Sequence, residues 1–475
     1  IGCGSLGGNT TADNNTAMGF DSLKANTTGA SNVAVGKNAL DANTSGSNNI
    51  AIGEGALGAN TTNTTNLAIG TSALLANNAA GDNLAIGHTA ASTNTSGYHL
   101  TAVGHYALVA NESAQGNTAV GHSALRAATT GASNTGIGKH ALCKLTTGAN
   151  NAAVGYAALC TATTSYDSVA LGGEALTLTT TGHTNTAIGR QAMCKNTEGA
   201  NNVAVGAFAL CANTTASDNT AVGKGALLEN TTGTRNTAVG KDSLDANTDG
   251  NDNTAIGRTS LSSNTTGDDN AALGVGALQS NTTGLCNTAI GTQAMISSLT
   301  GDGNVAVGYK ALYTNNGSTP DFNVAIGRQS LCKNTTGYRN VGSGLNSLFS
   351  NTTGHSNVAS GDAALYSNTT GSNNTGLGKD SLINATTGSA NVAIGVCAGS
   401  DASMINITTE SNRFIAGHND ITNSYVKVDW TVTSDLRDKT EIGDVPHGLE
   451  FVDKLKPVSF RFKKSRENPE PHGFK

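Results

Sequence analysis

The side chains best suited to chemistry in this 475-residue chain are its eight cysteines. Cys143 and Cys160 are seventeen positions apart, and Cys194 and Cys211 repeat that spacing. If residues at this spacing lie on adjacent layers, a layer separation of about 4.8 Å brings each pair within disulfide reach. Cys332 shares the same repeat position, where other copies carry Lys, Asp, Arg, Leu or Tyr. Because the position is so tolerant, free thiols are the simpler interpretation, and the sequence leaves both states open.

Metal chemistry has weaker support. No C-x-x-C pair favours zinc, and we expect no cluster of histidines. Residues 249–253 (DGNDN) and 301–304 (GDGN) resemble calcium loops, but calcium-binding β-rolls repeat a Gly/Asp pattern about every nine residues and these loops occur once each. We therefore expect no metal and no cofactor. Triplets such as Asn9-Thr10-Thr11 match the glycosylation acceptor only because the repeat is rich in Asn and Thr.

A third candidate is the hexapeptide at residues 434–439 (SDLRDK). A serine followed by acidic residues is typical of a helix N-terminus, where its hydroxyl accepts a backbone N–H and carboxylates face the positive end of the helix dipole. From these six residues alone, a helix cap is the simplest interpretation.

Most of these side chains belong to a sequence repeat with a period of seventeen residues. A glycine after a small apolar pair recurs at this period from Gly2 to Gly308 and, after one step that is longer by two, from Gly327 to Gly395, which makes 24 copies. The consensus is N-T-A-I-G-x-x-A-L-x-x-N-T-T-G-x-x. Leu or Met lies four residues after the glycine in 22 of the 24 copies. Each copy is therefore one structural unit that buries its apolar residues against its neighbours.

One coil of a parallel β-solenoid fits this repeat length, because helix pairs need more than about 30 residues and leucine-rich repeats at least about 20. N-T-A-I supplies a short strand and the glycine a bend. A-L supplies an inward anchor on a second strand or a single helical turn. N-T-T-G supplies an outer turn, in which Asn and Gly tolerate left-handed backbone. The predicted fold is thus an all-β parallel β-solenoid, or β-roll, of about 24 coils with seventeen residues in each.

The asparagine four residues before the aligned glycine is present in 21 of the 23 copies that include this position. Stacked at about 4.8 Å, these side chains are expected to form a ladder of amides along a rod roughly 115 Å long. The inward residues are small and aromatic residues make up only 4% of the chain, so one coil encloses a thin core. We therefore expect several chains to share buried surface in a homo-oligomer.

Composition excludes several classes of protein. Gly accounts for 60 of 475 residues, far from the one third or so of collagen, and the ample small apolar residues argue against disorder. No stretch approaches the roughly 18 apolar residues of a membrane span. A net charge of −6 gives no basic surface for nucleic acid. The chain begins at Ile1 in the middle of a repeat, so we expect further residues before it.

The composition changes sharply at residue 434. Residues 434–475 carry 17 charged side chains, against 43 in the 433 residues before them, and four of the five prolines. This change predicts three domains: a β-solenoid array over 1–400, a neck over 401–433, and a separate C-terminal segment over 434–475.

Two strands are expected within the neck. Residues 411–417 resemble a last, degenerate strand of the repeat. Residues 425–433 alternate apolar and polar residues, with Trp430 in the apolar set, as a half-buried strand does. Such a strand would lock the end of the rod.

The repeat motif N-T-A-I-G-x-x-A-L-x-x-N-T-T-G resembles the head repeats of trimeric autotransporter adhesins of the YadA type. It also resembles arrays found in phage tail-fibre-like proteins. The resemblance covers residues 1 to about 400 and implies a trimeric, parallel β-roll fibre. The adhesin head repeat is shorter than the repeat of this chain, so the handedness of the coil does not follow from it.

The C-terminal segment resembles the intramolecular chaperone of endosialidase, the peptidase S74 module that ends many phage tail fibres and spikes. The resemblance rests on S-D-L-R-D-K at 434–439, a helix-like stretch with Leu449, L-K-P-V-S-F-R-F at 455–462, and the start of a further strand at 472–474. It implies that the module, a small α/β domain, trimerises, assists folding of the fibre and then cuts itself off. Residues 434–475 correspond to the N-terminal part of that module.

By this resemblance Ser434 is the nucleophile, Lys439 the general base, and Thr433–Ser434 the scissile bond. A serine hydroxyl is a weak nucleophile without an adjacent base, and a lysine serves as one only when burial lowers its pKa well below about 10.4. Burial in an assembled trimer would therefore couple cleavage to correct assembly. Asp435 and Arg437 also match the motif and are assigned a structural role.

The sequence thus predicts a homotrimeric structural fibre or host-adhesion protein of the tail-fibre type, located in a virion or at a cell surface. Its expected partner is a host-surface receptor, with glycans among the candidates, and neither nucleic acid nor a membrane segment is expected. The rod itself is expected to be non-enzymatic, so any catalysis is a single self-cleavage. The alternative is a bacterial adhesin of the trimeric autotransporter type. A glycan-degrading tailspike enzyme is more remote, because the rod offers no paired carboxylates at positions that break the repeat.

Overall fold

The computed structural model describes residues 2–315, 321–401, 405–418, 420–422, 462–463 and 471–472. They fall into two compact units, Ile1–Asp420 and Ile421–Lys475, and each is described by itself. The regular elements in the described residues are all β-strands, and no helix there has the length and hydropathy of a membrane span.

The strands, in chain order, are β1 (Thr16–Met18), β2 (Val33–Val35), β3 (Ile50–Ile52), β4 (Leu67–Ile69), β5 (Leu84–Ile86), β6 (Thr101–Val103), β7 (Thr118–Val120), β8 (Thr135–Ile137), β9 (Ala152–Val154), β10 (Val169–Leu171), β11 (Thr186–Ile188), β12 (Val203–Val205), β13 (Thr220–Val222), β14 (Thr237–Val239), β15 (Thr254–Ile256), β16 (Ala271–Leu273), β17 (Thr288–Ile290), β18 (Val305–Val307), β19 (Val324–Ile326), β20 (Val341–Ser343), β21 (Val358–Ser360), β22 (Thr375–Leu377), β23 (Val392–Ile394), β24 (Ser400–Asp401), β25 (Ile405–Asn406), β26 (Phe414–Ala416), β27 (Phe462–Lys463) and β28 (Pro471–His472).

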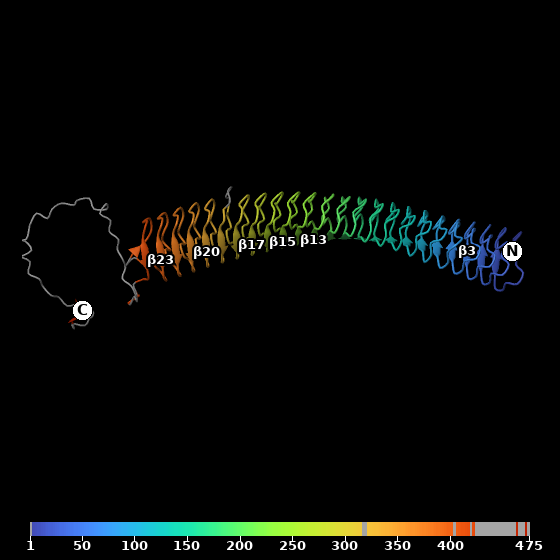
Figure 1. Cartoon of the computed structure of the whole chain (residues 1–475), viewed down its shortest axis with the longest axis horizontal. Coiled ribbons are helices and arrows are strands. Elements are labelled where there is room, and N and C mark those ends of the chain that lie inside the picture. Colours follow the sequence, from blue (N-terminus) through green and yellow to red (C-terminus); the bar gives the residue numbers. More distant parts are fainter. Residues whose placement is uncertain are drawn as a thin grey trace, which may run out of the picture. The chain divides into compact units, whose positions relative to one another are not determined.

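The first unit is an elongated, gently curved stack of coils (Figure 1). Among the described residues, β1–β23 and β26 form one parallel sheet of 24 strands, in which each strand pairs with the equivalent strand of the next coil. Ala238, for example, pairs with Ala255, its equivalent one repeat further on. The step is longer by two between β18 and β19, where Val305 pairs with Val324. The predicted fold class, an all-β parallel β-solenoid with about 24 coils, is confirmed.

The glycine after each strand is required by its backbone. Gly257 has φ = 134°, a region that residues with a side chain rarely occupy. A Cβ at this position would also overlap the carbonyl oxygen of Gly274 in the next coil. The coils can therefore stack only if every copy carries glycine here, which explains the spacing seen in the sequence.

The A-L segment forms two consecutive turns, and not the strand or helical turn that the sequence predicts. Ala209 N–H donates to the carbonyl of Gly206 (3.3 Å), and Asn213 N–H donates to that of Leu210 (3.2 Å). Leu210 has φ = 51°, a left-handed conformation that costs a side-chain-bearing residue about 1–2 kcal/mol. Its side chain is fully buried, which stabilises by about 1.5–3 kcal/mol, so burial outweighs the strain.

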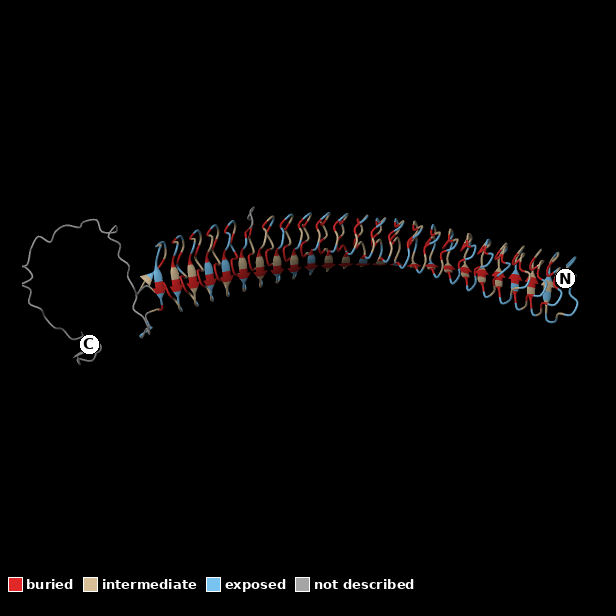
Figure 2. Ribbon diagram, in the orientation of Figure 1, coloured by how far each residue is buried: buried red, intermediate tan, exposed pale blue. Residues whose placement is uncertain are grey.

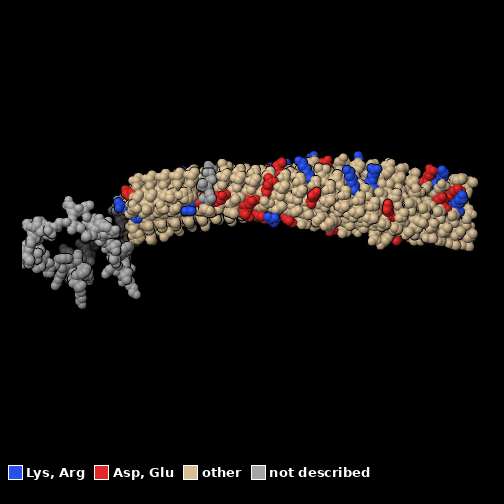
Figure 3. Space-filling model, turned by 45° about the horizontal axis from the view of Figure 1, so that its top comes forward, with Lys and Arg blue, Asp and Glu red and all other residues tan. Residues whose placement is uncertain are grey.

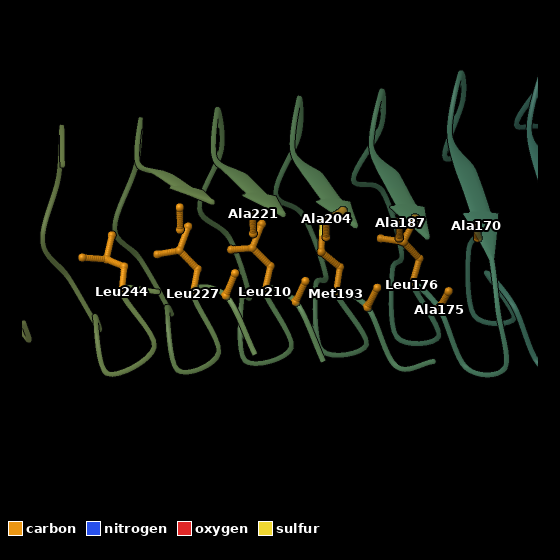
Figure 4. Close-up of a cluster of buried hydrophobic side chains, with 14 of the residues drawn as sticks. Ala170, Ala175, Leu176, Ala187, Met193, Ala204, Leu210, Ala221, Leu227 and Leu244 are labelled. Carbon is orange, nitrogen blue, oxygen red and sulfur yellow. The ribbon is translucent and has the colours of Figure 1, made fainter. Parts of the chain in front are cut away.

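The buried leucines and methionines form one continuous core. Leu176, Met193, Leu210, Leu227 and Leu244 come from successive coils and lie in a row that faces the alanines of the strands (Figure 4). In β2–β23 and β26 the middle residue is buried while its neighbours are exposed or half-buried, so burial alternates along each strand (Figure 2). Because alanine fills most of the strand side and one leucine fills the other, the core is as thin as the sequence predicts.

The predicted ladder of asparagines is present and fully buried. Asn253 donates from its backbone N–H and from Nδ2 to Oδ1 of Asn236 in the preceding coil (3.0 and 3.2 Å). Its Nδ2 also donates to the carbonyl of Gly267 in the following turn (2.7 Å). Each amide therefore connects three successive coils.

A second buried ladder, which the sequence analysis missed, runs through the asparagine of N-T-T-G. Asn264 Nδ2 donates to Oδ1 of Asn247 (2.9 Å) and to the carbonyl of Gly267 (2.9 Å). Both ladders thus converge on the Gly267 carbonyl. A Cβ on Gly267 would overlap Asn264 Oδ1, so crowding explains this glycine; its φ is not among the left-handed values, and the expectation of left-handed backbone there is wrong.

The C-terminal end of the rod departs from the repeat. β26 pairs with β23 at a step that is longer than the repeat by five, so the strand predicted at 411–417 joins the sheet of the rod. The additional residues include β24 and β25, which pair with each other in antiparallel fashion. Gly399 takes the place of the usual leucine, and Ile407 and Ile415 are buried beside it. These larger side chains fill the space that the missing leucine leaves in the last coil.

The ladders yield a direct prediction for stability. Replacing Asn264 with Ala removes the donor to Asn247 Oδ1 and the acceptor for Asn281 Nδ2, which are both buried. We expect a loss of about 2 kcal/mol, since a buried polar group without a partner costs roughly 1–3 kcal/mol. Thermal unfolding followed by circular dichroism measures the change.

The matched control is Thr266→Ala in the same turn, where the side chain is exposed. It should change stability by no more than about 0.5 kcal/mol, as most surface substitutions do. Equal unfolding midpoints for the two variants would contradict a stabilising role for the ladder.

Candidate functional site

The residues predicted to cut the chain, Thr433, Ser434 and Lys439, lie outside the described residues. The strand predicted over 425–433 lies outside them as well. The geometry of the Ser–Lys dyad and the position of the scissile bond therefore stay predictions.

The described residues of the second unit are 421–422 and one strand pair. β27 pairs with β28 in antiparallel fashion, with Phe462 opposite His472 and Lys463 opposite Pro471. The pairing joins the end of the L-K-P-V-S-F-R-F motif to the start of the further strand predicted at 472–474. The backbone thus brings together two of the motif segments on which the family resemblance rests.

On the rod, the most extensive candidate for binding is the outward surface of the large sheet, here called the strand face. It consists of the first and third residues of β1–β23 and β26, none of which is charged. Large apolar side chains on it are at least one third exposed: Met18, Ile50, Ile52, Ile137, Val169, Leu171, Val203, Ile256, Leu273, Ile290, Ile326, Val341, Val358, Ile394 and Phe414.

The strand face is a large uncharged surface, on which apolar side chains alternate with threonine at the first position of ten strands and with Ser343 and Ser360. With strands about 4.8 Å apart and outward residues about 6.6 Å apart along a strand, it covers roughly 800 Å². A surface on which many large apolar side chains are exposed together is typical of a protein–protein interaction site. The strand face therefore has the size and chemistry of a protein–protein interface.

The charged side chains lie away from the strand face, and two of the ion pairs in the described residues join adjacent coils. Arg235 contacts Asp252 (2.7 Å) and Lys37 contacts Glu54 (3.1 Å), both at the surface. On the face drawn in Figure 3, acidic and basic side chains are interspersed and become sparser toward the C-terminal end of the rod. Solvent screens exposed pairs of this kind, so they contribute little to stability and do not hold the coils together.

The acidic loops that resemble calcium sites are engaged in hydrogen bonds between coils. Asp252 accepts two bonds from Arg235 (2.7 and 2.8 Å), which lower the pKa of this carboxyl group. Asp249 accepts a bond from Thr232, and Asp302 accepts one from the backbone N–H of Leu285. Within the part of the chain that the structure describes, no group of three or more His, Cys, Asp or Glu side chains is arranged to hold a metal ion.

The histidines do cluster, and the expectation that they would not is wrong. His105 Nε2 lies 3.1 Å from His88 Nδ1, its ring contacts His122 edge-on, and Tyr106 stacks on it at 4.0 Å. Partial desolvation, His88 and His122 lower the pKa of His105, which favours neutral imidazole. The signal was available, because His88, His105 and His122 occupy the same position of three successive repeats.

The cysteine pairs lie as the repeat predicts. Sγ of Cys143 is 3.2 Å from Sγ of Cys160, and the sulfurs of Cys194 and Cys211 are 3.0 Å apart. All four residues are half-buried and carry free thiols. The repeat therefore brings together two pairs of groups that can react with each other.

Comparison with known proteins identifies the C-terminal segment. Residues 434–474 match the Peptidase_S74 family, described as the chaperone of endosialidase. No curated protein matches the chain. The match begins at Ser434 and includes Lys439, β27 and β28. The chain therefore carries a chaperone-of-endosialidase domain at its C-terminus, beyond a β-solenoid rod.

Proposed function

We propose that the chain is the shaft of a homotrimeric fibre of the tail-fibre type, whose C-terminal domain assists assembly and then cuts the chain before Ser434. The proposal rests on the order of the rod and the C-terminal domain along the chain. A parallel β-solenoid of 24 strands is followed by a chaperone-of-endosialidase domain that starts at residue 434. A rod built only from stacked coils is a structural element. A domain that assists folding of such a rod is needed only during assembly, so it can be removed from the end of the rod afterwards.

The strand face supports the trimer. Its footprint of roughly 800 Å² is of the same order as the area of about 800 Å² that one partner buries in a stable interface, although a trimer divides it between two neighbours. A partner that covers it must present apolar groups at the spacing of the coils along the whole rod. A second and a third copy of this chain do so coil by coil, because each carries the same uncharged strand face.

The proposed cleavage uses residues of the C-terminal domain only. Lys439 in its neutral form removes the hydroxyl proton of Ser434, whose Oγ attacks the carbonyl carbon of Thr433. The C–N bond then breaks, the lysine returns the proton to the amino group of Ser434, and water hydrolyses the ester. Because an unassembled chain leaves lysine solvated with a pKa near about 10.4, the base becomes active only after burial.

The same proposal places the fibre on a virion or at a cell surface, where its free length contacts a host receptor. The rod suits this role because its turns expose many polar Thr side chains while the coils keep a fixed spacing. A bacterial surface adhesin would use the same rod, and the C-terminal domain is the feature that favours the tail-fibre type.

Cleavage is tested by intact mass of the full-length protein. The unmodified protein should yield two products that meet between Thr433 and Ser434, whereas Ser434→Ala and Lys439→Ala should reduce cleavage at least about 100-fold, because a nucleophile and its base act as a unit. Ser465→Ala, in the same domain but outside the segments 434–439 and 455–462, is the control and should cut normally. A cut that persists in Ser434→Ala, or an uncut parent protein, would contradict the proposal.

The trimer is tested by the mass of the particle in solution, measured by light scattering after size-exclusion chromatography. The protein should have three chain masses. The variant Ile256→Asp/Leu273→Asp/Ile290→Asp places charges on three adjacent strands of the strand face and should abolish the trimer, because carboxylates buried without partners are strongly disfavoured.

The matched control carries the same number of charges on other sides of the coils, at Val275, Leu285 and Leu299, which are similarly exposed. This variant should remain trimeric. A monomeric parent protein, or a strand-face variant that still has three chain masses, would overturn the assignment of the interface.

A further inference from the structure

We propose that Cys143–Cys160 and Cys194–Cys211 are two disulfide sites that clamp adjacent coils of the rod, each closed by exchange with a low-molecular-weight disulfide. The proposal is independent of the trimer and of cleavage, since all four cysteines lie in the rod and outside the strand face.

Geometry supports bond formation. The sulfurs are already 3.2 and 3.0 Å apart, so a shift of about 1 Å brings them to the S–S length of about 2.05 Å. Coils at about 4.8 Å place the two Cα atoms within the usual range of about 4.4–6.8 Å. Side-chain rotation therefore closes the bond without a change in the stacking of the coils.

The surroundings single out these two pairs. All four side chains are half-buried, which leaves the sulfurs accessible to a small oxidant. Cys332 occupies the same repeat position but is buried, and the corresponding residues of its neighbouring coils are Tyr313 and Phe349. Cys332 is therefore an internal control: it lies at the same repeat position, but the adjacent coils carry no cysteine there.

One sulfur in each pair is prepared to react as a thiolate. A hydrogen bond from Cys160, together with nearby Lys144, lowers the pKa of Cys143 to about 7. A hydrogen bond from Cys194, together with Lys195, lowers the pKa of Cys211 to about 7. Since the thiolate is the nucleophile in thiol–disulfide exchange, one cysteine of each pair can attack an oxidant at neutral pH and its neighbour, with the sulfurs adjacent, can resolve the mixed disulfide.

The exchange balances with a disulfide RSSR as the oxidant. The Cys143 thiolate attacks one sulfur of RSSR, forms Cys143–S–S–R and releases RS⁻. Cys160 then loses its proton and attacks the Cys143 sulfur, which releases the second RS⁻ and leaves the Cys143–Cys160 disulfide. Overall the protein loses two hydrogens for each pair, and RSSR becomes two RSH. Cys211 and Cys194 take the same roles in the second pair.

The closed bonds would act as longitudinal clamps. Each links equivalent positions of two successive repeats and so holds one whole coil against the next. A reductant would open both bonds and return the four thiols.

The test equilibrates the folded full chain with oxidised glutathione and an excess of reduced glutathione, which reverses mixed disulfides on single cysteines, then quenches with acid, removes the glutathione and titrates thiols with Ellman's reagent in denaturant. Of eight cysteines, four should remain reactive, and peptide mapping should find Cys143 joined to Cys160 and Cys194 to Cys211. Cys143→Ser should leave five reactive thiols out of seven, because one pair can no longer close. Cys332→Ser should leave three out of seven, because both pairs still close.

Both variants should fold, because this repeat position accepts many polar residues elsewhere in the rod. Eight reactive thiols, glutathione retained as a mixed adduct at these sites, or cross-links between chains would overturn the proposal. Six reactive thiols would overturn it for the pair that stays reduced.

Discussion

Buried amide side chains that only a neighbouring coil can satisfy are the interaction on which the rod depends. Asn236, Asn253 and Asn270 form one ladder, Asn247 and Asn264 belong to the other, and both ladders repeat along most of the sheet. An unpaired buried amide costs roughly 1–3 kcal/mol, so a coil that shifts by one residue loses several bonds at once. The ladders therefore fix the register that the thin alanine and leucine core leaves weakly specified.

The same regularity creates a problem that the C-terminal domain is suited to solve. Because the strand faces of all coils are nearly alike, two chains displaced by one coil would make almost the same contacts in the proposed fibre. The interface alone therefore sets the register between chains poorly. A domain at one end that brings three chains together before the rods pair would remove this ambiguity, and its later loss would make the product difficult to unfold and reassemble.

The sequence predicted the features that follow from strict periodicity, namely the coil length, the short strands, the inward leucines and the first asparagine ladder. It did not predict the left-handed Leu210, because propensity argues against it and only burial in the assembled coil makes it favourable. The second ladder and the histidine row depend on which way the turn residues face in the assembled coil, and the periodicity of the sequence does not give that orientation. Ser434 and Lys439 lie within the family match but outside the described residues, so their roles stay predictions.

The measurement that tests the stacked-coil account most directly is deletion of part of the rod. Removing residues 237–253, one complete repeat, should join equivalent positions and leave a rod that unfolds at nearly the same temperature, because every remaining amide still finds its partner. Removing only residues 237–244 should break both ladders and the glycine column at the junction and lower the unfolding midpoint markedly. Equal destabilisation by the two deletions would contradict the claim that register between coils holds this structure together.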